Sequence, residues 1–147
     1  MKILNEIKIT ADARSVNEGY LRVAVASFAA QLDPTVEEMS DIKTAVSEAV
    51  TNCIVHAYKI KTGKIYITAR LCENQLLIIK IRDTGIGIPD VQQAREPLFT
   101  TGGDDRSGLG FSVMECFSDK LKVSSKEGKG TTVTIYKRIR GKSVNEP

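Results

Sequence analysis

Residues 75–89 read QLLIIKIRDTGIGIP, an aliphatic run that stops at Asp83 and passes into two glycines and a proline. The Ile- and Leu-rich part, residues 75–82, has the composition of a strand. Residues 64–71 form a similar segment just upstream, separated from it by three residues of turn character. We expect these two segments to pair as a hairpin, with Asp83 at the end of its second strand.

The glycine-rich loop after this hairpin suits a flat ligand. Gly85 and Gly87 allow a close backbone approach, while Ile86 and Ile88 alternate with them and offer apolar surface. A simple hairpin turn is the alternative, but a turn needs no such apolar neighbours. With Asp83 accepting hydrogen bonds from an amino group, the loop predicts adenine recognition.

A long helix is predicted from Thr35 to about residue 58. Thr35 followed three residues later by Glu38 is a capping box. The expected buried stripe is Met39, Ile42, Val46, Ala49, Val50 and Cys53. The positions well off that stripe are Asp41, Ala45, Glu48 and Asn52. Glu48 and Asn52 lie one turn apart and suit a base beside a metal ligand, although such a pair alone is usually only a polar face.

Shorter elements flank this centre. Residues 2–10 and the segments 120–124 and 131–136 predict strands, and residues 12–32 and 111–117 predict helices. On the first helix the expected buried face is Val16, Tyr20, Val23, Ala24, Ser27 and Phe28. The opposite side is expected to carry Glu18, Arg22, Ala26 and Ala29. Residues 83–110 contain six glycines and predict a long functional loop, interrupted by a short helix at 90–95.

These elements predict one α+β domain over residues 1–147, a two-layer sandwich in which helices cover one face of a mixed, mostly antiparallel sheet. The other face is expected to be partly solvated. A hydrophobic content of 41% and a charged content of 27% are typical of a folded soluble protein. No apolar run fits a signal peptide or a membrane span, so we expect a cytoplasmic protein.

The cysteines and the basic tail carry little functional signal. Three widely spaced cysteines indicate neither a disulfide framework nor a zinc site. The net charge is +3, and a cluster of cations lies near the end of the chain: Lys137, Arg138, Arg140 and Lys142. We interpret that cluster as a solvated tail rather than a nucleic-acid patch, and expect no direct nucleic-acid partner.

A second glycine-rich segment precedes the predicted helix at 111–117. It reads Arg106-Ser107-Gly108-Leu109-Gly110. Free backbone N–H groups at a helix N-terminus form a natural phosphate cradle, so the segment predicts phosphate contacts.

Five motifs occur in the order typical of one superfamily. They are Glu48-x-x-x-Asn52, Asp83-x-Gly85-x-Gly87, Phe99-Thr100-Thr101, Gly108-x-Gly110 and Gly130-Thr131-Thr132. This order resembles the Bergerat ATP-binding fold of type II topoisomerases, heat-shock chaperones, mismatch-repair proteins, sensor histidine kinases and anti-sigma serine kinases. Residues 47–52, 96–101 and 106–111 look most like the anti-sigma serine kinases, in particular those of sporulation. One departure is Gly102-Gly103-Asp104-Asp105, where the family more often has Lys-Pro and one residue more.

The resemblance implies ATP or ADP and Mg²⁺ as ligands and assigns roles to the motif residues. Asn52 would hold Mg²⁺, and Glu48 would be the general base for an incoming serine hydroxyl. Asp83 would bind the adenine amino group, assisted by Thr131, with Gly85 and Gly87 closing around the base. The remaining nucleotide contacts would come from Thr101, Arg106, Ser107, Gly108, Leu109 and Gly110. His56, the only histidine, receives no catalytic role.

The resemblance also implies partners. Glu18 and Arg22 form an i, i+4 pair that is most often only a surface ion pair, but an arginine in this context contacts both partners in the family. Those partners are a sigma factor of the F type and an anti-anti-sigma protein that accepts the phosphate, and the family suggests a homodimer. Two alternatives remain: the equivalent kinase of a stress-response switch, and a partner-switching module that transfers no phosphate.

Overall fold

The computed structural model describes residues 2–57, 63–88, 90–91, 95 and 110–141. Its strands are β1 (Ile3–Asp12), β2 (Lys64–Cys72), β3 (Leu76–Arg82), β4 (Lys120–Lys126) and β5 (Gly130–Arg138). Its helices are α1 (Glu18–Ala29), α2 (Val36–Asn52) and α4 (Gly110–Cys116), with short turns η1 (Ser15–Asn17), η2 (Ala30–Leu32) and the π-helical η3 (Cys53–Ala57). The described residues contain no helix long and apolar enough to cross a membrane.

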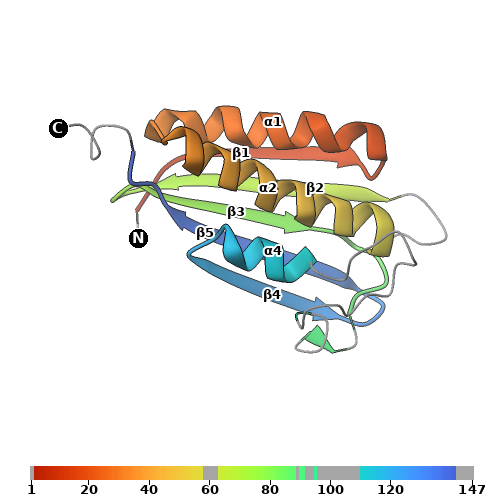
Figure 1. Ribbon diagram of the computed structural model, residues 1–147. Helices are drawn as coiled ribbons and strands as arrows, with labels where there is room; N and C mark the ends of the chain where they lie inside the picture. Colours follow the sequence, from red (N-terminus) through yellow and green to blue (C-terminus); the bar gives the residue numbers. More distant parts are fainter. Residues whose placement is uncertain (1, 58–62, 89, 92–94, 96–109, 142–147) are drawn as a thin grey trace.

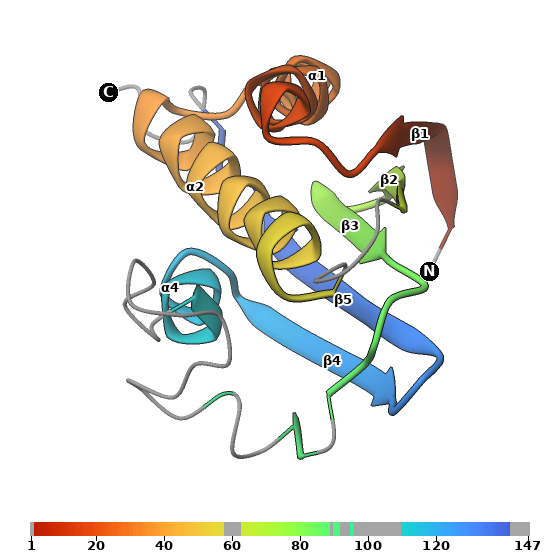
Figure 2. The ribbon, with the colours of Figure 1, turned by 90° about the vertical axis from the view of Figure 1, so that its right-hand side faces the viewer.

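The strands form one sheet in the order β1-β2-β3-β5-β4, and the helices lie over one of its faces (Figures 1 and 2). This confirms the predicted α+β sandwich. Every strand pairing in the described part of the chain is antiparallel. The expected hairpin is present as β2 and β3, paired from Tyr66 opposite Arg82 to Cys72 opposite Leu76.

The core lies between the sheet and the helices. Alternate residues of the central strands are almost fully buried: Ile65, Ile67, Ala69, Leu77, Ile79 and Ile81. They pack in one cluster with the stripe of α2, which buries Ile42, Val46, Ala49 and Val50, and with Cys53 at the start of η3. Each large aliphatic side chain in this layer stabilises the fold by about 1.5–3 kcal/mol. The same stripe holds α2 across the sheet and so fixes where Glu48 and Asn52 lie.

The predicted orientation of α1 is wrong. Val16, Tyr20 and Val23 are 73%, 65% and 54% exposed, and Ser27 is exposed as well. Of the expected face only Phe28 is buried, and the other buried residues are Leu21, Val25, Ala26 and Ala29. Apolar residues occur all around this helix, so periodicity fits two orientations. The small side chains of Ala26 and Ala29 allow α1 to pack closely against its neighbours, and this packing decides between the two orientations. Ala45 of α2 was expected off the buried stripe, but it is fully buried for the same reason.

The capping box at the start of α2 is present and extends to the last part of the chain. Glu38 N donates to Thr35 Oγ1 at 3.1 Å, and Thr35 N donates to Glu38 Oε1 at 3.0 Å. The same carboxylate accepts from the backbone N–H groups of Arg140, at 2.6 Å, and Gly141, at 3.1 Å. Burial alone would raise the pKa of Glu38, but these backbone hydrogen bonds outweigh it and lower the pKa.

Two further boundaries differ from the prediction. The α-helical part of α2 ends at Asn52, and η3 continues it to Ala57 as a π-helical turn. Half of the basic cluster lies in the sheet rather than in a tail, because Lys137 and Arg138 belong to β5, while Lys142 lies outside the described residues. Lys137 is only 9% exposed, and its Nζ lies 3.4 Å from Asp41 Oδ2.

Candidate functional site

Asp83 follows β3 directly and is fixed between its own loop and β5. Its side chain is buried, and Oδ1 accepts from the backbone N–H of Gly85 at 3.0 Å and of Thr131 at 3.2 Å. Asp83 N in turn donates to Thr131 O at 2.9 Å. Because backbone groups hold it on two sides, the carboxylate has its orientation before any ligand arrives.

The end of the α2–η3 helix touches this carboxylate through Cys53. The thiol hydrogen-bonds to Asp83, and burial raises the pKa of Cys53 well above its ordinary value, so Sγ–H is the donor. Burial also raises the pKa of Asp83, while the N–H groups of Gly85 and Thr131 and the Cys53 thiol partly oppose that rise. A carboxylate has about four acceptor positions, so three donors leave capacity for one more.

The loop beyond Asp83 is tied to two other segments. Ile86 N donates to Ala57 O of η3 at 3.0 Å, and Gly128 N donates to Ile86 O at 2.6 Å. Ile88 N donates to Ser125 Oγ of β4 at 2.7 Å. The loop therefore bridges the end of the helix and the β4–β5 turn, with the exposed side chain of Ile86 beside it.

The glycines of this loop are required by chain packing. A Cβ on Gly85 would lie 2.2 Å from Ala57 O, and a Cβ on Gly87, whose φ is +76°, would lie 2.2 Å from Lys126 O. We expected these glycines to let the backbone approach a base. In the structure, a side chain at Gly85 or Gly87 is excluded by the backbone of neighbouring segments of this chain.

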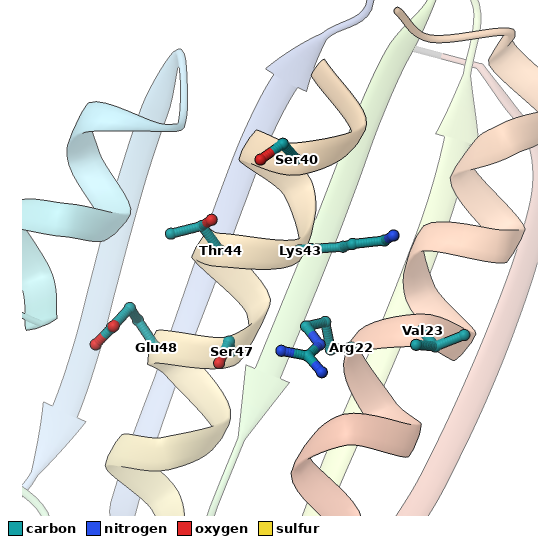
Figure 3. A pocket seen from close by; sticks show the side chains of 7 residues that line it. All are labelled: Arg22, Val23, Ser40, Lys43, Thr44, Ser47 and Glu48. Atoms are coloured by element: carbon teal, nitrogen blue, oxygen red, sulfur yellow. The ribbon is translucent and has the colours of Figure 1, made fainter. Parts of the chain in front are cut away.

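Glu48 and Asn52 lie on the same helix, one turn apart and both half-buried. Asn52 immediately precedes Cys53, so it lies at the end of α2 that meets Asp83. A hollow of about 280 Å³ opens over α1 and α2, and Glu48 lines it. Its other lining residues are Arg22, Val23, Ser40, Lys43, Thr44 and Ser47 (Figure 3). Glu48 points to the side of α2 away from α1.

Glu18 and Arg22 form the expected i, i+4 pair on α1. Arg22 Nε lies 3.7 Å from Glu18 Oε2, which is too long for a hydrogen bond, and this buried Oε2 has no hydrogen-bond partner in the described part of the chain. In Figure 3 the Arg22 guanidinium points from α1 toward α2, whereas Glu48, which also lines the hollow, points to the other side of α2.

The structure thus brings together part of the expected site. Gly110 begins α4, and α4 packs against α2. Thr131 shares a hydrogen bond with Ser125, Oγ to Oγ1 at 2.8 Å, beside Asp83. The expected contacts Thr101, Arg106, Ser107, Gly108 and Leu109 lie outside the described residues, as do most of the predicted helix at 90–95 and the altered segment 102–105.

Two residues that contribute to this site were not predicted from the sequence. Cys53 was read only as a core residue, although its position directly after Asn52 is a signal for it. Ser125 lies in a strand that the sequence extends only to residue 124, and its contact with the Ile88 backbone depends on the paired β4 and β5. No local pattern marks it.

Comparisons with known proteins agree on one family. The family model for the histidine kinase-like ATPase domain matches residues 9–137. A protein named anti-sigma F factor from Caldanaerobacter subterraneus is 51% identical over 140 residues, 95% of this chain and 97% of the relative. A protein of the same name from Clostridium perfringens is 49% identical over 137 residues, 92% of this chain and 97% of the relative.

Solved structures share the fold at lower identity. The RsbU and RsbW domains of a Mycobacterium tuberculosis protein superpose with a TM-score of 0.66 at 19% identity, covering 92% of this chain and 32% of that one. The histidine kinase domain of a blue-light activated kinase from Erythrobacter litoralis gives 0.61 at 21% identity, covering 90% and 65%. At these identities the likeness extends to the fold alone.

Proposed function

This chain belongs to the anti-sigma F factor family, with its histidine kinase-like ATPase domain, and from that membership we propose that it binds and inhibits a sporulation sigma factor of the F type. We further propose that it is a protein serine kinase that uses ATP to phosphorylate, and so inactivate, an anti-anti-sigma antagonist. It would act in the cytoplasm as a homodimer of one-domain subunits.

The observation that carries this proposal is the buried carboxylate of Asp83, which follows β3 and lies beside the end of the α2–η3 helix. It is held by Gly85, Thr131 and Cys53 and keeps acceptor capacity. An adenine amino group is a donor of the right kind for that remaining capacity. The apolar Ile86, 46% exposed beside it, offers surface for the face of a base.

Magnesium and the phosphates would lie between Asn52 and the N-terminus of α4. Mg²⁺ accepts few protein oxygens and keeps several waters, so a single carboxamide beside ATP phosphates suits it. Gly110 begins α4, which packs against α2, so its free N–H groups lie near the same helix. We propose that Thr101, Arg106, Ser107, Gly108 and Leu109 complete the phosphate contacts. ATP bound there supplies the γ-phosphoryl group.

Glu48 would act on the acceptor side. Placed one turn from Asn52 and half-buried, it can take the proton from a serine hydroxyl as that oxygen attacks phosphorus. Most of the rate enhancement would come from holding the two reactants in line rather than from covalent chemistry. The hollow over α1 and α2, which both Glu48 and Arg22 line, gives the antagonist a place to dock.

Arg22 would be the contact for both protein partners. Its ion pair with Glu18 is long and the Arg22 side chain is partly exposed, so the guanidinium is accessible to a partner. A guanidinium offers five donors in a fixed fork, which suits a carboxylate on a partner surface. Competition of sigma factor and antagonist for one arginine would make their binding mutually exclusive.

The test is transfer of label from γ-³²P-ATP. We expect the purified protein with Mg²⁺ to label one serine of an antagonist from the same genome, and to hold the sigma factor in a pull-down when ATP is present. A protein that binds the sigma factor but labels no antagonist would be the non-catalytic module. If the pull-down captures a stress-response sigma factor instead, the protein would be the equivalent kinase of a stress-response switch.

A further inference from the structure

The sheet face opposite the helices concentrates positive charge. Strand pairing aligns outward-facing residues of all five strands in one row: Lys8, Thr68, Lys80, Thr134 and Lys122. A second row contains Glu6, Arg70, Ile78, Tyr136 and Lys120, and a third contains Thr10, Tyr66, Arg82, Thr132 and Ser124. We call this surface the outer sheet face.

Most of these cations are unneutralised. Arg70 pairs with Glu6, Nε to Oε2 at 2.6 Å. The others form no salt bridge within the described part of the chain: Lys8, Lys80, Arg82, Lys120 and Lys122. The whole chain has a net charge of only +3, so five unpaired cations on one face make the molecule strongly asymmetric. A face of this kind attracts a polyanion.

Their spacing is regular. Lys80 and Arg82 are two residues apart on β3, as are Lys120 and Lys122 on β4, so each pair is separated by about 6.6 Å along its strand. A linear polymer with one negative charge per repeating unit fits this periodic array of cations better than a protein surface with scattered acidic side chains does.

Aromatic rings lie among the cations. The Arg82 guanidinium is 4.2 Å from the centre of the Tyr66 ring. The Lys120 and Lys122 ammonium groups are each 5.7 Å from the centre of the Tyr136 ring. Aromatic rings and arginine planes on an open sheet are the surfaces on which unpaired bases stack, with cations nearby for the phosphates.

We propose that the outer sheet face binds single-stranded RNA. The hydroxyls of Thr68 on β2 and Thr132 on β5, both half-exposed in the rows of cations, provide partners for ribose 2′-hydroxyls. A five-stranded sheet face is broader than the helix or two-stranded ribbon that the major groove of duplex DNA admits, so an unpaired strand is the better match. This inference is independent of the kinase proposal, and it reverses the expectation of no nucleic-acid partner, which considered only the tail.

The first test is fluorescence anisotropy of the full chain with a 5′-fluorescein 20-nucleotide oligouridine. With about five phosphate contacts, we expect affinity to fall about 100-fold between 50 and 200 mM KCl. The same sequence as single-stranded DNA should bind more weakly. Absence of binding at 50 mM KCl, or equal binding of DNA or of duplex RNA, would overturn the proposal.

Variants locate the site. Lys80→Glu with Lys122→Glu reverses two charges on the outer sheet face and should weaken binding at least 30-fold at 50 mM KCl. Arg14→Glu with Lys43→Glu makes the same charge change at exposed positions outside this face, with Lys43 on α2, and should change affinity less than threefold. Equal losses for both double variants would contradict the assignment. Circular dichroism melting confirms that each variant is folded.

Two further measurements distinguish base stacking from electrostatic attraction. Tyr66→Leu with Tyr136→Leu should cost about tenfold in affinity and leave the salt dependence unchanged, because no phosphate contact is lost. A labelled polyglutamate of equal charge should bind more weakly than the RNA. Tighter binding of polyglutamate would identify the face as a dock for an acidic protein segment and overturn the RNA proposal.

Discussion

Asp83 and Thr131 hold each other by two reciprocal hydrogen bonds across 48 positions of sequence. Thr131 N donates to Asp83 Oδ1 at 3.2 Å, and Asp83 N donates to Thr131 O at 2.9 Å. The contact joins the end of β3 to the start of β5, so the sheet itself orients the carboxylate. Ligand binding at this position therefore carries no free-energy cost for ordering the Asp83 side chain.

The Asp83→Asn variant should separate stability from nucleotide binding. Asparagine keeps an oxygen for the two backbone donors but removes the buried charge, so we expect a ligand-free melting temperature equal to or above the wild type. Loss of a charge-assisted hydrogen bond of about 1.5–3 kcal/mol should weaken ATP binding about 10- to 150-fold. Differential scanning fluorimetry and calorimetry measure the two effects.

The difference in stability between the wild type and Asp83→Asn should depend on pH with a defined sign. Burial raises the pKa of Asp83 in the folded state above its ordinary 3.8. The folded protein therefore binds more protons than the unfolded chain just above pH 3.8, and the wild type regains stability relative to Asp83→Asn as the pH falls toward the raised pKa. A wild-type advantage at pH 7 that shrinks on acidification would contradict the burial argument.

Gly85→Ala should destabilise the protein, because the new Cβ would lie 2.2 Å from Ala57 O. Overpacking of this kind costs about 1–3 kcal/mol in the free energy of unfolding. Gly19→Ala is the matched control, since its Cβ meets only Arg22 Nη2 at 3.7 Å on α1 and should stabilise the helix by about 0.5 kcal/mol. Urea denaturation compares the two. Equal effects would show that the packing against Ala57 is absent.

Glu38→Gln should destabilise the protein by about 1–3 kcal/mol at pH 7, because the carboxylate accepts from Arg140, Gly141 and Thr35. The folded-state pKa is lowered below the ordinary 4.5. Its stabilisation is therefore complete above that value and is lost as the pH falls through the lowered pKa. The exposed Glu37→Gln serves as control, and a pH-independent difference in urea midpoints would refute the charge argument.

Arg22→Ala should weaken sigma factor and antagonist binding about tenfold or more, as for an interface arginine, and leave ATP affinity unchanged. Surface plasmon resonance with both partners measures this. Arg14→Ala, another exposed cation near the start of α1, should have no such effect. If Arg22→Ala leaves both partners bound at wild-type affinity, Arg22 has no part in the interface.

The sequence predicted those features that depend on local chemistry. The β2–β3 hairpin follows from two aliphatic segments with a short link, and the Thr35–Glu38 box from a spacing of three residues. The placement of Asp83 at a strand end follows from the same pattern. The anti-sigma family assignment also came from the sequence, because five short motifs keep a fixed order.

The features it missed depend on tertiary contacts. The orientation of α1 was wrong because Val16 and Val23 are as apolar as Leu21 and Val25, and only packing chooses between them. The role of Lys137 in β5 and the Cys53–Asp83 contact arise from segments distant in sequence. The cation rows of the outer sheet face exist only through strand register.

The central claim is that Glu48, Asn52 and the Asp83 loop form one nucleotide site in which Glu48 removes the serine proton. Calorimetry with MgATP and phosphotransfer to the antagonist, measured together on Glu48→Gln, test it most directly. The account predicts ATP affinity within about threefold of wild type and transfer reduced about 10²- to 10⁴-fold. Undiminished transfer by Glu48→Gln, or no heat of MgATP binding by the wild type, would contradict it.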